Sequence, residues 1–116
     1  MKEIQNIDDI QGVHLSDVCF VMDYVQLGFS GSIVTVHSRP VVETSATRCR
    51  FPEAGSRDAL CSLINQPLIK VTVEAGRLMT LMFDTGKIEI PLDVENRVCG
   101  DAAEFLPGRG KTIQDY

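Results

Sequence analysis

The most regular hydrophobic pattern in the chain lies in residues 68–91. Apolar and polar side chains alternate over residues 68–74, 78–83 and 87–90, and a period of two is typical of a strand with one buried face. Two turn segments separate these strands, and Gly86 in the second turn can take a positive φ. Pro91 ends the last strand. We therefore expect a three-stranded antiparallel meander over about residues 68–91.

Residues 13–37 show a weaker copy of the same pattern. Residues 15–20 align with residues 68–73 at an offset of 53 positions, and residues 25–30 align with residues 79–84 at an offset of 54. The order strand, turn, strand, turn, strand is the same in both copies, which favours a duplicated unit. We expect a first three-stranded meander over about residues 13–37.

The two copies differ on their second face. The first copy is less polar there, at the positions of Cys19, Val21, Gly28 and Ile33. We expect another element to cover this face. The candidate is a helix over about residues 56–65, because Ser56 can cap its first turn and Leu60, Leu63 and Ile64 follow at helical spacing. We expect this helix to pack on a sheet made by both meanders.

The remaining segments predict shorter elements. Asn6 can cap a helical turn over residues 6–11, and residues 41–44 and 48–51 favour strands. Residues 92–116 predict a loop-rich tail, in which residues 102–106 can form a short element that docks back. A chain of 116 residues fits one domain. We predict a single α+β domain, mainly antiparallel β, with two pseudo-repeated three-stranded meanders and one helix between them.

Length and cysteine usage bear on the compartment. No apolar run approaches the roughly 20 residues that a membrane span needs, and the first nine residues are acidic and lack the apolar centre of a secretory signal. We therefore expect a cytoplasmic protein that does not engage a membrane. Cys19, Cys49, Cys61 and Cys99 have no close pair, which predicts reduced thiols. We expect Cys19 and Cys61 to be buried and Cys99 to lie in a loop.

The sharpest chemical motif is Asp84-Thr85-Gly86, which follows an apolar strand like the triplet of retroviral-type aspartic proteases. Only 30 residues follow Gly86, and the first copy carries a turn at the same place, so we interpret the motif as a hairpin turn. His14 and His37 lie outside any metal-binding motif. We predict no enzymatic activity, no catalytic or metal-binding residue and no cofactor.

Charge favours a basic partner. The chain carries 16 acidic and 11 basic residues, for a net charge of −5, which disfavours direct binding of nucleic acid. Six acidic residues lie close together in the second meander and the tail, and they form either a solvated rim or a docking surface for a basic protein. We take the docking surface as the candidate partner-binding site: Asp84, Glu89, Asp93, Glu95, Asp101 and Glu104.

A repeated strand-and-turn pattern carries a family resemblance. Its residues are Gly12, Leu15, Val18, Leu27 and Phe29 in the first copy, Leu68, Val71, Leu81, Phe83, Asp84 and Gly86 in the second, and residues 100–105 near the end. The pattern resembles small bacterial domains encoded near polymorphic-toxin loci and some immunity proteins of contact-dependent inhibition systems. The resemblance implies a bacterial cytoplasmic protein that binds a cognate toxin domain, often a nuclease, and neutralises it by covering its active or substrate-binding surface. It carries over no catalytic residue.

Two other functions stay open. The chain can be an accessory or structural β-domain that forms a homodimer through an exposed strand edge. It can also bind a small ligand or act as a small enzyme, which requires a concave pocket that holds titratable groups.

Overall fold

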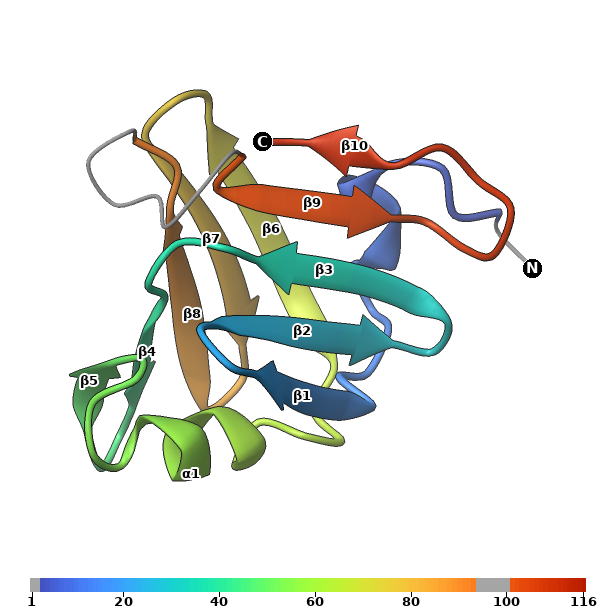
Figure 1. Ribbon diagram of the computed structural model, residues 1–116. Coiled ribbons are helices and arrows are strands. Elements are labelled where there is room, and N and C mark those ends of the chain that lie inside the picture. Colours follow the sequence, from blue (N-terminus) through green and yellow to red (C-terminus); the bar gives the residue numbers. More distant parts are fainter. Residues whose placement is uncertain (1–2, 94–100) are drawn as a thin grey trace.

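The computed structural model describes residues 3–93 and 101–116, and most of its regular structure is antiparallel β-strand (Figure 1). The mainly antiparallel β class is therefore confirmed. The strands are β1 (Asp17–Val21), β2 (Tyr24–Phe29), β3 (Ser32–Val36), β4 (Val41–Thr44), β5 (Arg48–Arg50), β6 (Leu68–Glu74), β7 (Leu78–Phe83), β8 (Gly86–Pro91), β9 (Ala103–Leu106) and β10 (Gln114–Asp115). The helices are the 3-10 helix η1 (Ile7–Ile10) and the α-helix α1 (Ser56–Cys61).

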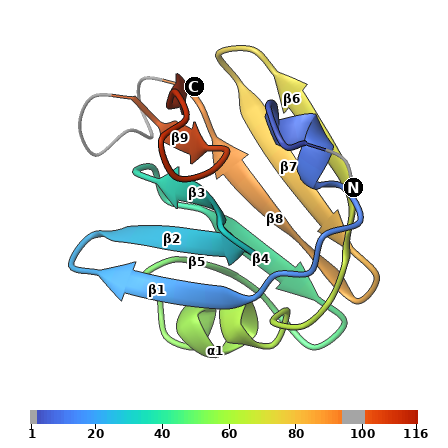
Figure 2. The same cartoon turned by 90° about the vertical axis from the view of Figure 1, so that its right-hand side faces the viewer.

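The strands form two sheets rather than one. The first has the order β1-β2-β3-β9-β10 and the second the order β5-β4-β8-β7-β6. The strands of the first sheet cross those of the second, and Figures 1 and 2 show the two layers from perpendicular directions. The two meanders therefore do not share the sheet on which we expected the helix to pack, and the choice among one sheet, a sandwich and a closed barrel, which the sequence left open, falls on two sheets. Each meander has one apolar face, and the two faces bury each other across the layers. A common origin of the two meanders stays a prediction.

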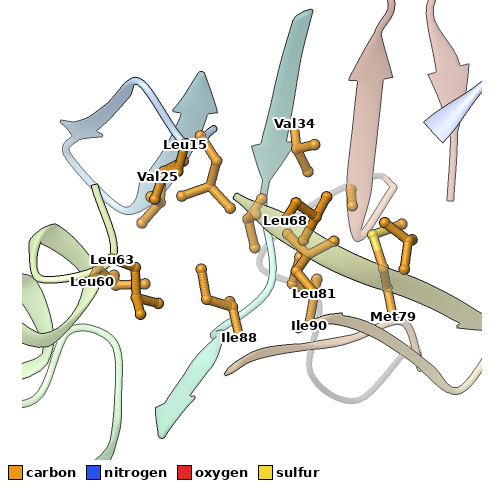
Figure 3. Close-up of a cluster of buried hydrophobic side chains, with 14 of the residues drawn as sticks. Leu15, Val25, Val34, Leu60, Leu63, Leu68, Met79, Leu81, Ile88 and Ile90 are labelled. Carbon is orange, nitrogen blue, oxygen red and sulfur yellow. The ribbon is translucent and has the colours of Figure 1, made fainter. Parts of the chain in front are cut away.

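The core lies between the sheets (Figure 3). Phe29 of β2 stacks on Phe83 of β7, with ring centroids 6.4 Å apart, so an aromatic pair joins the two layers. Leu60 and Leu63 extend the same core at the end that α1 closes. Inward and outward side chains alternate along the strands, so each buried row leaves a matching row on the outer face of its sheet.

The helix α1 differs from its prediction in length, cap and position. It ends at Cys61, and Gly55, with φ 87°, occupies the N-cap position. Ser56 is the first helical residue, and its hydroxyl donates to the carbonyl oxygen of Glu53 at 2.6 Å. The helix contacts β4 and β1 at one end of the two sheets (Figure 1). It does not lie across the outer face of the first sheet, where we had expected it.

The two chain termini add to the first sheet and its flank. The tail is more regular than the sequence indicated, because β9 pairs with β3 and β10 pairs with β9. Phe105 of β9 is fully buried, which fixes this strand on the core. Lys111 donates to the carbonyl oxygen of Ile4 at 2.7 Å, and η1 buries Ile7 and Ile10. Residues far apart in sequence therefore hold the β10 edge together.

Two local details of the second sheet also depart from expectation. A bulge between Leu68 and Lys70 shifts the register of β6, so Ile69 is 55% exposed instead of alternating into the core. The Asp84-Thr85-Gly86 segment forms the predicted turn between β7 and β8. Gly86, however, does not have a positive φ. A Cβ atom added at Gly86 would lie 2.5 Å from the carbonyl oxygen of Glu43, so glycine permits close approach of β4 and β8.

Candidate functional site: an open sheet face

Among the residues that the structure describes, no helix or strand packs across the outer face of the first sheet, and we call this face the open face. Cross-strand register aligns its outward side chains into rows. One row begins with Asp17 on β1 and continues with the nonpolar residues Gly28, Ile33 and Leu106, and the next is Cys19, Gln26, Thr35, Glu104 and Asp115. A third row holds Val21, Tyr24 and, just beyond β3, His37. The open face therefore combines a mainly nonpolar row, a polar row and an aromatic pair.

A hollow of about 280 Å³ lies in the middle of the open face. Side chains from β2, β3 and β9 line it, together with His37 and with Ile113 ahead of β10. Ile113 is 49% exposed, and the other lining residues are half-buried. Small-molecule sites occupy about 300–1,000 Å³. The hollow is therefore suited to one side chain of a partner.

The polar centre of the hollow is a hydrogen bond between a histidine and a glutamate. His37 Nε2 lies 2.6 Å from Glu104 Oε1. An ionised carboxylate only accepts hydrogen bonds, so this contact places a proton on Nε2. The ring of Tyr24 is tilted by 44° against the His37 ring, with centroids 5.2 Å apart. On the floor, Gln26 Nε2 donates to Thr35 Oγ1 at 3.4 Å. These contacts orient the polar groups before any partner arrives.

The open face carries acidic side chains without basic ones. Asp115 on β10 stands directly opposite Glu104 on β9, so a second carboxylate lies next to the one that lines the hollow. Asp17 lies over Gly28 at the other end of β1. The outward-facing residues of these five strands, all within the described parts of the chain, include no lysine or arginine. This face therefore favours contact with a positively charged group.

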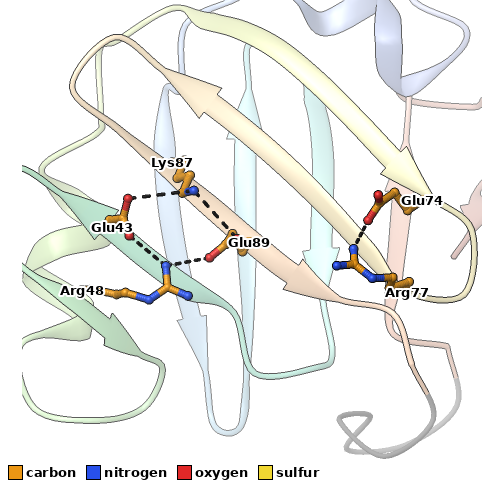
Figure 4. Close-up of polar contacts among 6 residues, drawn as sticks. All are labelled: Glu43, Arg48, Glu74, Arg77, Lys87 and Glu89. Carbon is orange, nitrogen blue, oxygen red and sulfur yellow. Dashed lines mark hydrogen bonds and ion pairs between the residues drawn. The ribbon is translucent and has the colours of Figure 1, made fainter.

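The outer face of the second sheet is different, because its charges pair with one another (Figure 4). Arg48 lies 2.9 Å from Glu43 and 2.8 Å from Glu89, and Lys87 lies 3.9 Å from each of these two carboxylates. The hydrogen bonds that Arg48 donates, first to Glu89 and then to Glu43, raise the pKa of Arg48 above its usual value. This face is a mixed, internally neutralised surface.

The structure separates the acidic residues that the sequence brought together. Asp84 is exposed in the β7–β8 turn, Asp93 lies beyond the opposite end of β8, and Glu89 belongs to the paired network of the second sheet. Asp101 is exposed just before β9, and Glu104 lies in the hollow. The predicted residue Glu95 falls outside the described residues. Glu104 is thus the predicted site residue that lies at the candidate site.

Sequence reasoning missed other polar and aromatic groups of the hollow, Tyr24, Gln26, Thr35 and His37, and the neighbouring Asp115. The available signal was the less polar second face of the first meander. We interpreted that face as covered by a helix, and the structure leaves it open. Because strand register is non-local, residues from three distant segments meet there without any shared motif.

The cysteines are more accessible than expected. Cys19 and Cys61 are exposed rather than buried, and Cys49 is half-buried against the core. Cys19 is outward because it stands opposite Gln26 on the open face, and Cys61 is the last residue of α1. Cys99 lies outside the described residues.

The described residues also bear on a metal site and on a membrane span. Residues 3–93 and 101–116 contain no group of three or more His, Cys, Asp or Glu side chains arranged to hold a metal ion. Over the same ranges, neither helix is long and apolar enough to span a bilayer. No protein-family model, no curated protein and no solved structure matches the chain.

Proposed function

We propose that this chain is a binding protein that recognises another protein through the open face. The observation that carries the proposal is an uncovered sheet face in which Tyr24, Ile33 and Leu106 surround the polar centre of His37 and Glu104. Protein interfaces typically combine aromatic and apolar anchors in a pocket with a polar rim. The second sheet lacks this arrangement on its outer face, where opposite charges already neutralise each other.

We further propose that the partner is a cognate bacterial toxin domain, a nuclease being one candidate, which the chain neutralises in the cytoplasm by covering its active or substrate-binding surface. The resemblance of the repeated strand-and-turn pattern to immunity proteins supports this class of partner. Charge also supports it, because the outward-facing strand residues of the open face, all of which the structure describes, include carboxylates and no lysine or arginine. A toxin surface that binds nucleic-acid phosphate is basic and complements such a face.

Co-expression with the neighbouring gene tests this function. The expected result is that the chain restores growth of cells that produce the neighbouring gene product and that a tagged chain retains it in stoichiometric amount at moderate salt. Varying the amount of the chain distinguishes binding from catalytic protection. Protection by binding saturates when the chain and its partner are present at a one-to-one ratio. Unrestored growth together with no retained partner contradicts the proposal.

A second candidate is a homodimer through β6, the edge strand of the second sheet. Ile69 and Val73 on β6 are 55% and 38% exposed, and Met82 on the adjacent strand is 41% exposed. In an antiparallel pair of β6 strands centred on Thr72, Lys70 of one copy faces Glu74 of the other, which is a favourable cross-strand pair. The side chain of Gln11 accepts from Val71 N–H at 2.9 Å and has to move aside. The molecular mass in solution decides, because a monomer at high concentration rules this candidate out.

A further inference from the structure

The hollow of the open face contains three kinds of surface that one side chain can contact together. The ring of Tyr24 forms an aromatic wall, Glu104 supplies a carboxylate, and Ile33 and Leu106 supply an apolar strip. Asp115, opposite Glu104 on the adjacent strand, places a second carboxylate beside the hollow. Glu104 uses Oε1 to contact His37, which holds the carboxylate in place beside the aromatic ring. A ligand for this hollow has to be cationic, planar at its end and apolar along its stem.

We propose that the hollow anchors one arginine side chain of the partner protein, an inference that rests on the proposed function. A guanidinium group stacks on an aromatic ring and donates in parallel to carboxylate oxygens, while its methylene stem packs on apolar side chains. A lysine ammonium is a point charge that lacks the planar, forked geometry. Arginine therefore matches the aromatic wall, the two carboxylates and the apolar strip.

The charge environment of the hollow selects the same class of ligand. None of the outward-facing strand residues of the open face is basic, and the nearby Lys111 already contacts Glu3 at 3.1 Å and the carbonyl oxygen of Ile4. An incoming guanidinium therefore meets no competing lysine or arginine among the outward-facing strand residues of this face. His37 is the one group that shares Glu104 with it among the described contacts.

Capped arginine and capped citrulline test the anchor chemistry, because citrulline is a neutral analogue of nearly the same shape. We expect N-acetyl-arginine amide, titrated to tens of millimolar and followed by NMR, to shift the amide signals of Tyr24, Thr35 and Glu104. Capped citrulline should bind about tenfold more weakly, since it loses the cation–π and ionic contacts. Equal binding of the two probes, or the absence of arginine-induced shifts at the hollow, overturns the proposal.

Matched variants keep the test independent of folding defects. Asp115→Asn changes an exposed carboxylate at the hollow and Glu104→Gln a half-buried one, and each should bring arginine binding toward the citrulline level. Asp84→Asn, in the exposed β7–β8 turn, should leave it unchanged. The probe needs no partner, so its failure while the neighbouring gene product still binds refutes only the anchor chemistry. Arginine binding without any such complex refutes only the proposed function.

Discussion

Two glycines, one on a non-edge strand of each sheet, make a matched test of how closely the strands approach. A Cβ atom at Gly28 lies 2.1 Å from Asp17 Oδ1, and a Cβ atom at Gly86 lies 2.5 Å from the carbonyl oxygen of Glu43. The first contact is shorter, yet we expect Gly86→Ala to be the more damaging substitution. An exposed carboxylate can rotate away, whereas a backbone carbonyl moves only if β4 and β8 separate.

The magnitude follows from the neighbours of each position. At Gly86, the side chains of Leu63 and Thr44 are already 3.3 Å from the added Cβ, so strand separation is the main relief. Overpacking of this kind costs about 1–3 kcal/mol, and the lower chain entropy of unfolded alanine returns about 0.4–1 kcal/mol. We expect a net loss of about 1.5 kcal/mol for Gly86→Ala and a change within about 0.5 kcal/mol for Gly28→Ala.

Urea unfolding of the two variants measures this difference. With a slope of about 1–3 kcal/mol per molar urea, Gly86→Ala should lower the midpoint by roughly 0.5–1.5 M, while Gly28→Ala stays near the parent. If the dependence of the unfolding free energy on urea concentration is the same in both variants, the difference in midpoint reports on the folded state. A Gly28→Ala variant that loses as much stability as Gly86→Ala refutes the reasoning. In that case the length of the contact determines the loss of stability, and the rigidity of the contacted atom does not.

Three further outcomes follow from burial and charge. Burial raises the pKa of Tyr116 above its usual value of about 10, so stability should be complete below that pH and fall as the pH rises through the folded-state pKa; Tyr116→Phe should abolish this alkaline loss in urea midpoints measured at about pH 9 and pH 11. Cys19 and Cys61 should react with a thiol reagent in the native protein much faster than Cys49, as peptide mapping can show. Arg48→Met should shift the midpoint of thermal unfolding only slightly, because the Arg48 side chain is exposed and surface ion pairs contribute little to stability.

The strands were predictable because their signal is local. Alternation over residues 68–91 and its weaker copy in residues 13–37 located β1–β3 and β6–β8. The assignment of strands to two sheets was not predictable in this way, because it depends on which apolar faces bury each other. Ile69 shows the same limit on a smaller scale, since one bulged residue was enough to turn it from the core to solvent.

The candidate site was predicted only in part, for a related reason. The density of acidic residues along the chain pointed to Glu104, but it equally pointed to Glu89, which the fold pairs with Arg48. Charge density in sequence does not reveal which carboxylates find a basic neighbour. Tyr24 and His37 carried no signal of their own, because they come together only through the pairing of β2 with β3.

The central claim, that the open face binds the partner, is tested most directly by comparing Thr35→Arg with Thr80→Arg. Thr35 is half-buried on the open face, where it stands opposite Gln26 and Glu104, and Thr80 is half-buried at the matching outward position of β7 in the second sheet. The measurement is the affinity of each folded variant for the partner retained on co-expression. We predict that Thr35→Arg, which fills the hollow, abolishes binding and that Thr80→Arg leaves it unchanged. Equal affinities, or a loss confined to Thr80→Arg, contradict the claim.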